Sequence, residues 1–362
     1  MNSNIVSTKY WHAVDEGRLQ CDLCPRHCQL KESQRGLCYV RQHLDGEIKL
    51  VSYGRSSGFC IDPIEKKPLN HFYPGSAVLS FGTAGCNLTC KYCQNWDMSK
   101  SRKMDTLAAA ASAQQLANAA RKTNCRSIAY TYNDPVIFLE YAVDTAAACR
   151  AQDIKNVAVT AGYIDPEPRA EFFNAMDAAN VDLKSFTDEF YFKLCGGHLA
   201  PVLETLEYIQ HETDCWLELT TLLIPGANDS VQELHDMSRW VVAALGPDVP
   251  MHFTAFHPDW KMMDTASTPL SSLRRAREIA MQNGVRYAYT GNVHDSASAS
   301  TWCHACGELL IERDWHRLGS WGLDEKGCCQ YCSTVIPGHF AAQPGSFGPQ
   351  RIPIRISHAP GA

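Results

Sequence analysis

The sequence predicts an α/β protein whose core is a partial or full parallel (β/α) barrel. The first observation is an alternation, from residue 77 onward, of short β-branched or aromatic runs with helical segments, at about 25–35 residues per unit. The second is that the segments on either side of this core carry cysteines and lack such periodicity. The third is that most of the seventeen cysteines gather into three tight groups.

From the alternation we expect strands with helices between them. The strands are at residues 77–81, 127–132, 156–160, 180–186, 216–224, 251–256 and 286–291. The helices include residues 113–122, 135–152, 168–179, 231–245 and 270–284. Six or seven such units favour a barrel over a doubly wound sheet, and the chemistry of a parallel barrel lies at the carboxyl ends of its strands.

The flanking regions divide the chain further. We expect a cysteine-rich module and lead-in segment at 1–72, the barrel core at 73–297, and a zinc-ribbon-like module at 298–340. Residues 341–362 are rich in Pro and Gly without an apolar period, which predicts a disordered tail.

Composition limits the functional class. The 362 residues include 33 basic and 39 acidic side chains, a net charge of −6, which gives no general attraction to nucleic acid or to an anionic membrane. The first residues lack the pattern of a signal peptide, and no apolar run approaches the roughly 20 residues that cross a bilayer. We therefore expect a cytoplasmic protein, in which clustered thiols hold metals rather than form disulfides.

Cys86, Cys90 and Cys93 lie directly after the first expected strand, at the rim of the barrel. A closed zinc site uses four protein ligands, and no fourth candidate lies close by. Three thiolates on a 4Fe–4S cluster would leave one iron open to a substrate or cofactor. A stray thiol group, or a zinc loop that shares a ligand from elsewhere, is the alternative.

The stretch "CNLTCKYC" resembles the C-x3-C-x2-aromatic-C signature of radical S-adenosylmethionine (SAM) enzymes, with Tyr92 at the aromatic position. The resemblance implies that the open iron binds SAM. It also implies that an electron, from a donor such as flavodoxin or ferredoxin, then releases a 5′-deoxyadenosyl radical. The protein would supply an open coordination site, orientation and a dry cavity.

Further matches follow later strands. "YTYNDP" occupies the place of the superfamily turn that holds the SAM ammonium, which implies a contact from Asn133 or Asp134. The same residues suit an Asx turn that caps the next helix. Thr160, in "TAGY", is expected to face the same rim and bind the cofactor.

Two matches resemble glycyl-radical-enzyme activases. "VDLKSF" is similar to their D-x-K stretch, which implies Asp182 as a SAM-side carboxylate and Lys184 as a catalytic lysine; a buried ion pair is the alternative. "FTAFHPD" places His257 where an activase has a histidine near SAM, which implies a catalytic role; a satisfied core histidine is the alternative.

Over nearly the whole chain, the series from "CDLCPRHCQL" to "YTGNVHD" is similar to the radical SAM member of the AmmeMemoRadiSam system. The resemblance implies AMMECR and Memo family proteins as partners. The chain departs from the family pattern at Asp134, where glutamate is usual, and at Cys60, where a small apolar residue is expected.

Two further cysteine groups lie outside the core. Two C-x2-C pairs separated by 22 residues are close to a zinc-ribbon spacing and predict a structural zinc, with rubredoxin-like iron as the alternative. Their ligands are Cys303, Cys306, Cys329 and Cys332. For the N-terminal group, zinc and a second iron–sulfur cluster fit equally. Its ligands are Cys21, Cys24, Cys28 and Cys38.

The leading hypothesis is an enzyme that cleaves SAM and uses the radical to abstract hydrogen from a small-molecule or protein substrate. The alternatives are a glycyl-radical-enzyme activase and a non-catalytic metal-binding, redox-sensing or RNA-binding protein. We also expect the N-terminal segment to cover the rim, with Lys66, Lys67 and His71 near the cavity. The two lysines, with Lys184, would favour a polar, anionic substrate; a solvated turn is the alternative for "EKK".

Overall fold

A nine-stranded sheet forms the centre of the protein. This computed structural model describes residues 4–102 and 107–356. The parallel strands are β9 (Ala77–Phe81), β11 (Ser127–Tyr130), β12 (Lys155–Thr160), β13 (Ala178–Asp182), β14 (Trp216–Leu223), β15 (Met251–Ala255) and β16 (Ala288–Gly291). Each pairs in parallel with the next, so their carboxyl ends meet at one edge of the sheet.

Two antiparallel strands extend the sheet beyond β9. β8 (Phe59–Pro63) pairs with β9, and β20 (Ile352–Ile354) pairs with β8. Within the described residues, the edge strands β16 and β20 do not pair with each other. The sheet is therefore an open, partial barrel.

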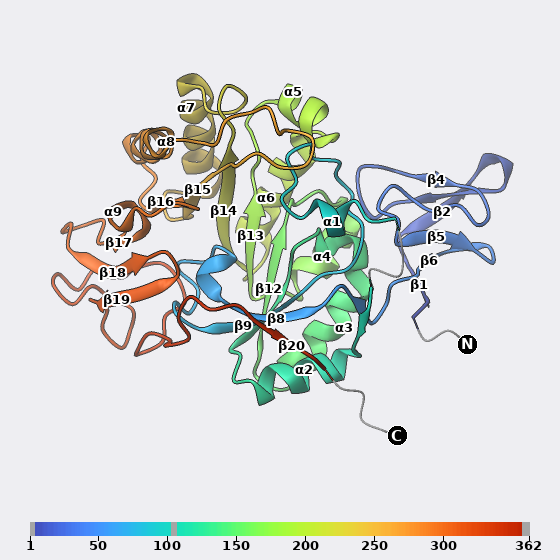
Figure 1. Cartoon of the computed structure of the whole chain (residues 1–362), viewed down its shortest axis with the longest axis horizontal. Helices are drawn as coiled ribbons and strands as arrows, with labels where there is room; N and C mark the ends of the chain where they lie inside the picture. The colour runs from blue at the N-terminus through green and yellow to red at the C-terminus, as the bar shows by residue number, and fades with distance from the viewer. Residues whose placement is uncertain (1–3, 103–106, 357–362) are drawn as a thin grey trace.

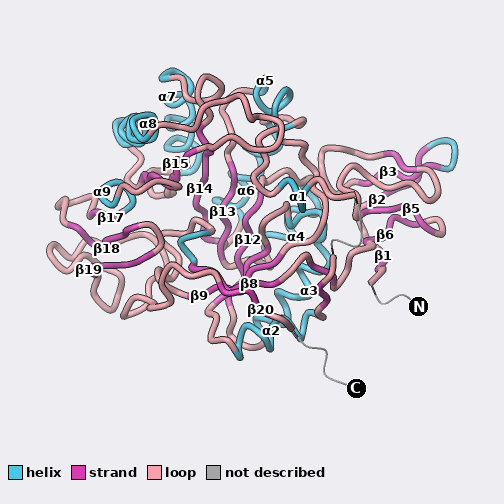
Figure 2. Tube along the Cα trace, viewed as in Figure 1, coloured by secondary structure: helices cyan, strands magenta, loops and turns pink. Residues whose placement is uncertain are grey.

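Helices connect the parallel strands and gather around the sheet, as Figure 2 shows. The longer ones are α2 (Ala113–Lys122), α3 (Leu139–Arg150), α4 (Pro166–Phe173), α6 (Ala200–Glu212), α7 (Val231–Trp240) and α8 (Leu270–Gln282). Short ones are α1 (Trp96–Ser99), α5 (Asp188–Phe190) and α9 (Ser296–Ala299). Local chemistry sets several starts: Ser112 and Gln115 form a capping box at α2, and Ser230 caps α7. No helix in the described ranges is long and apolar enough to cross a membrane.

The expected strands all form, but one is displaced. β13 ends at Asp182 instead of continuing to residue 186. The backbone beyond it bonds outside the ladder, because the Lys184 N–H donates to the Tyr191 hydroxyl and the Leu183 carbonyl accepts from Thr221. This early exit from the sheet places Lys184 past the strand end.

Two modules built mainly of strands and loops lie on opposite sides of the central sheet (Figure 1). The N-terminal module contains β1 (Val6–Ser7), β2 (Trp11–Val14), β3 (Arg18–Cys21), β4 (Gln29–Leu30), β5 (Arg41–Leu44) and β6 (Glu47–Leu50). The C-terminal module contains β17 (Thr301–Trp302), β18 (Leu309–Asp314) and β19 (Arg317–Trp321). A small ladder, β7 (Arg55–Ser56) with β10 (Ala109–Ala110), completes the strands.

Buried polar contacts attach the N-terminal segment to the core. Arg41, whose side chain is 1% exposed, makes two contacts of 2.8 and 2.6 Å with Glu140 of α3, and its Nε donates to the Ile137 carbonyl. Such a two-point ion pair fixes orientation as well as distance.

His71 does not lie near the cavity, contrary to our expectation. It is buried between the core and the C-terminal module, with Nε2 2.6 Å from the Tyr289 hydroxyl and Nδ1 2.6 Å from the Pro337 carbonyl. Its backbone N–H donates to Glu218. The histidine therefore holds a seam between distant parts of the chain, which its local sequence could not indicate.

The expectation of a disordered tail is wrong for residues 341–356. Ile352–Ile354 form β20, with Ile352 opposite Ile61 and Ile354 opposite Phe59. Pro353 is tolerated because β20 is an edge strand, where a missing N–H costs no ladder bond. Residues 357–362 lie outside the described residues.

Candidate active site

The loop after β9 carries Cys86, Cys90 and Cys93, as expected. Glycines make its path possible, because a Cβ on Gly82 would lie 2.3 Å from the Thr131 carbonyl oxygen. A Cβ on Gly85, at φ +87°, would lie 1.8 Å from the Cys38 carbonyl oxygen. The loop is thus held between the second strand of the core and the N-terminal cysteine module.

All three thiols line one cavity; Cys90 is buried, and Cys86 and Cys93 are partly buried. Burial, and next the Asp134 carboxylate, raise the pKa of Cys86 to about 12. Burial also raises the pKa of Cys93, whose sulfur lies 3.0 Å from the Ser99 hydroxyl. The free thiols are therefore neutral, and a metal centre would have to displace their protons to bind.

Asn133 supports the cysteine loop. Its side-chain oxygen accepts from the Thr83 N–H at 3.1 Å, and its nitrogen donates to the Gly85 carbonyl at 2.9 Å. The amide therefore uses both ends to hold the backbone before Cys86, while still lining the cavity.

Asp134 joins the ends of two strands. Its carboxylate accepts from Val136 N–H at 3.1 Å, from the Thr160 hydroxyl at 2.9 Å and from Ala161 N–H at 2.9 Å. Burial raises the pKa of Asp134, although the hydrogen bonds from these three donors act to lower it. A carboxylate offers about four acceptor positions, so a ligand donor can still be accommodated, and the helix-cap interpretation holds as well.

Asp182 and Lys184 form an ion pair and also line the cavity. Lys184 Nζ lies 2.7 Å from the Asp182 carboxylate. Burial opposes the charge on Lys184, but the Asp182 carboxylate together with the sulfurs of Cys90 and Cys195 outweighs it, and the pKa of the lysine is raised. Lys184 is therefore a fixed cation beside the cysteine loop.

Of two further expected residues, Tyr92 lines the cavity and His257 does not. The Tyr92 ring lines the cavity, and its hydroxyl lies 3.1 Å from Cys195, a cysteine that the sequence did not single out. His257 is exposed and is not among the residues that line the cavity. The geometry gives no support to a catalytic role for His257.

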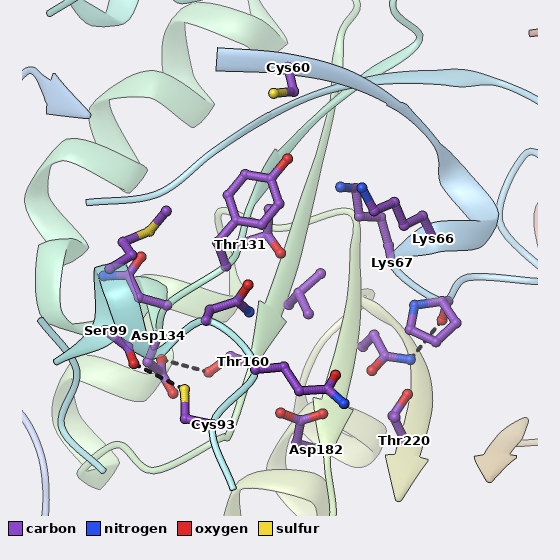
Figure 3. A pocket seen from close by; sticks show the side chains of 18 of the residues that line it. Cys60, Lys66, Lys67, Cys93, Ser99, Thr131, Asp134, Thr160, Asp182 and Thr220 are labelled. Carbon is purple, nitrogen blue, oxygen red and sulfur yellow. Dashed lines mark hydrogen bonds between the residues drawn. The ribbon is translucent and has the colours of Figure 1, made fainter. Parts of the chain in front are cut away.

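The cavity encloses about 1460 Å³, which exceeds the range usual for one small ligand. Figure 3 shows Cys93 and Asp134 on one side, Lys66 and Lys67 across the space, and Asp182 and Thr220 below. Several lining residues were not predicted from the sequence, because they come from β13, β14, the C-terminal module and the tail. They are Asn180, Thr220, His316, Arg351 and Arg355.

The four C-terminal thiols form a compact candidate metal centre. Their sulfurs all lie within 4.8 Å of one another. The Cys303–Cys332 and Cys306–Cys329 sulfur separations are 3.6 and 3.7 Å, close to the roughly 3.8 Å edge of a tetrahedron with metal–sulfur bonds of about 2.3 Å. Gly307, at φ +79°, shapes the turn after the first pair. This group is able to bind a metal, zinc or iron.

The N-terminal cysteines lie beside the cysteine loop of the core. Their module contacts this loop at Cys38 and Gly85, and the Arg26 Nε donates to the Asn87 carbonyl at 2.7 Å. Three of the four are buried. A Cβ on Gly36 would lie 3.7 and 3.8 Å from the sulfurs of Cys28 and Cys38, so the glycine leaves room around them. Zinc or an iron–sulfur cluster at these thiols stays a prediction.

Comparison with known proteins identifies the core. The radical SAM superfamily profile matches residues 81–238. The protein MJ0808 of Methanocaldococcus jannaschii, described as uncharacterized, is 38% identical over 328 residues, which is 90% of this chain and 97% of MJ0808.

Three solved structures are more distant. Streptococcus suis SuiB is 14% identical, with a TM-score of 0.49 over 64% of this chain and 52% of SuiB. A radical SAM methyltransferase of Sphaerobacter thermophilus is 13% identical, with a TM-score of 0.48 over 84% of this chain and 81% of its own. A domain of the pyruvate-formate lyase-activating enzyme of Bacteroides vulgatus is 17% identical, with a TM-score of 0.41 over 46% of this chain and 99% of its own.

Residues 81–238 form a radical SAM superfamily domain, and the whole chain belongs to the same family as MJ0808. Members of this superfamily are generally enzymes, and the radical SAM fold implies a 4Fe–4S cluster and SAM. The donor set fits, because three thiols of one loop line a cavity large enough for both groups.

Proposed function

We propose that this protein is an enzyme that reductively cleaves SAM at a 4Fe–4S cluster on Cys86, Cys90 and Cys93. The proposal rests on one observation: these three thiols share a cavity with Asp134, Asp182 and Lys184. When bound, the cluster and SAM supply a 5′-deoxyadenosyl radical that abstracts hydrogen from a substrate.

The residues of this chain orient the bound groups and exclude water. Asp134 and Thr160 lock the ends of β11 and β12 together, which gives a SAM ammonium a fixed carboxylate. The paired Asp182 and Lys184 offer fixed charges of both signs for the polar ends of SAM. Such preorganised groups need no rearrangement during the reaction.

We favour a small-molecule substrate over a glycyl radical protein. Both lysines line the cavity; Lys67 is buried, with 2% of its side chain exposed, whereas Lys66 is exposed at 36%. β20 and the turn at His316 also line the space. These walls support a substrate that enters the cavity as a free molecule.

Membership of the AmmeMemoRadiSam system, with AMMECR and Memo family partners and a flavodoxin or ferredoxin electron donor, belongs to the same proposal. Its support is the sequence resemblance, which extends beyond the core into the N-terminal cysteine module.

The test is anaerobic reconstitution with iron and sulfide, followed by dithionite and SAM. We expect iron–sulfur absorption and 5′-deoxyadenosine in the parent. Cys86→Ala, Cys90→Ala or Cys93→Ala should lower the absorption and abolish the 5′-deoxyadenosine. The matched control is Cys125→Ala, because Cys125 is also buried but does not line the cavity. Undiminished 5′-deoxyadenosine from the three loop variants would overturn the proposal.

A further inference from the structure

The wall of the cavity opposite the cysteine loop is strongly cationic. Four basic side chains line it: Lys66, Lys67, Arg351 and Arg355. They come from segments almost three hundred residues apart, the turn after β8 and the tail around β20. Figure 3 shows Lys66 and Lys67 directed across the cavity from Cys93 and Asp134.

One buried carboxylate organises this wall. Asp62, which is fully buried, accepts from Lys66 Nζ at 3.0 Å, from Lys67 Nζ at 2.7 Å and from the Tyr132 hydroxyl at 2.7 Å. The register of β20 on β8, with Ile352 opposite Ile61, places Arg351 next to this carboxylate. Asp62 therefore fixes two ammonium groups but balances only one of them.

The acid next to Lys66, Glu65, is held by another part of the chain. Glu65 also lines the cavity, but its carboxylate accepts from the Gly75 backbone N–H. Beside these four cations lie two carboxylates, Asp62 and Glu65, while Asp97, Asp134 and Asp182 also line the cavity. Each ammonium keeps donors that Asp62 does not use. Lys184, by contrast, is paired with Asp182 and adds no excess charge.

Two polar oxygens between the walls point to a ligand. Asn180 Oδ1 and Thr220 Oγ have no hydrogen-bond partner among the described residues, and both side chains line the cavity. Asn180 is fully buried and Thr220 is 8% exposed. Asn180 Nδ2 already donates to the Pro68 carbonyl at 2.7 Å, so its free oxygen requires a donor. Buried polar groups are rarely left unpaired, because each costs free energy.

We propose that this wall binds the anionic end of a small hydroxylated substrate, a carboxylate or a phosphate, whose hydroxyl groups reach Asn180 and Thr220. The inference rests on the proposed function, since it names the substrate class of that site. The cationic wall attracts the anionic end electrostatically, and the two polar oxygens orient the hydroxylated part of the molecule toward the cysteine loop.

The test measures equilibrium binding by calorimetry on the full chain without SAM. The probes are glycerol 3-phosphate, glycerate and neutral glycerol, so the phosphate and carboxylate arms are separated. We expect at least one anion to bind more tightly than glycerol, because charge-assisted bonds form only with the anions.

Variants locate the binding. Lys66→Gln and Arg351→Gln should each weaken binding of the anion by about tenfold, because each removes one charge-assisted hydrogen bond. Lys122→Gln, at the exposed end of α2, is the matched control and should bind as the parent does. Thr220→Val should weaken binding of glycerol 3-phosphate more than binding of inorganic phosphate, which lacks the carbon-bound hydroxyls.

The inference is overturned if neither anion binds better than glycerol, or if both charge variants bind the anion as the parent does. Because SAM and reduced cluster are absent from this assay, such a failure leaves the 5′-deoxyadenosine result unaffected. Loss of 5′-deoxyadenosine with intact anion binding would instead refute the proposed reaction alone.

Discussion

Removing one thiol ligand from the C-terminal metal centre should destabilise that module. Cys306 is exposed, so Cys306→Ala creates no cavity in a core. Its sulfur nevertheless lies 3.7 Å from that of Cys329 within the four-thiol group. The variant therefore tests the metal and little else.

The magnitude follows from what else holds the module. Its buried cluster is small: Leu310, Ile311, Leu323 and Ile336 pack with Tyr287 and Tyr289 of the core and with two of the four thiols. A segment of about 40 residues rarely folds on such a core alone, whereas a structural zinc supplies about 10–16 kcal/mol in peptide sites. We expect the variant to lose at least about 4 kcal/mol of local stability.

Hydrogen exchange measures this directly. A loss of about 4 kcal/mol accelerates exchange by about 1000-fold for amides protected by the module, such as Cys329 N–H bonded to the Thr334 carbonyl. Metal analysis should find one zinc per chain more in the parent than in the variant. Cys328→Ala is the control, since Cys328 adjoins a ligand but is not among the four grouped thiols. Exchange and metal content unchanged in Cys306→Ala would refute the reasoning, and a loss of iron instead of zinc in this variant would assign the site to iron.

Two further predictions concern stability. Arg41→Met should lower the free energy of unfolding of the N-terminal module by about 3–5 kcal/mol, because it leaves Glu140 without its ion-pair partner. Adding Glu140→Gln should restore part of that free energy, and a free energy of unfolding for Arg41→Met within about 1 kcal/mol of the parent, measured in urea, would contradict the prediction. Burial lowers the pKa of His71 to about 4, so the unfolded chain binds a proton that the folded chain does not, and stability should fall by about 2–3 kcal/mol as the pH drops from about 6.5 to about 4. His71→Gln should show a shallower pH dependence in denaturant unfolding, and an identical one would exclude the histidine as the source.

The sequence was sufficient for the parallel core because its signals are local. The run at Ala77–Phe81 formed at the predicted residues, and so did the helix at Ala113–Lys122. The cysteine spacing identified the loop, since three thiols within eight residues must lie near one another. Asn133 and Asp134 could be placed at the rim because they follow a parallel strand directly.

The rest of the site depends on contacts between remote segments. β20 pairs only Ile352–Ile354 with β8, and a run so short and rich in Pro carries no strand signal. His71 bonds to Pro337 across most of the chain, and its neighbours in sequence do not reveal that partner. Asn180 and Thr220 read as ordinary interior residues of strands until the open sheet leaves their oxygens facing a cavity.

The open sheet explains why the tail matters. A partial barrel leaves one side of its interior without a parallel strand, and here β8 and β20 extend that side. Because β20 pairs with the strand that carries Cys60 and Asp62, the tail brings Arg351 beside the carboxylate that holds Lys66 and Lys67. The wall that faces the cysteine loop is therefore assembled from the two ends of the chain around a shared core. In such an arrangement, changes in these terminal segments can alter which substrate is held without disturbing the groups that hold the cluster and SAM.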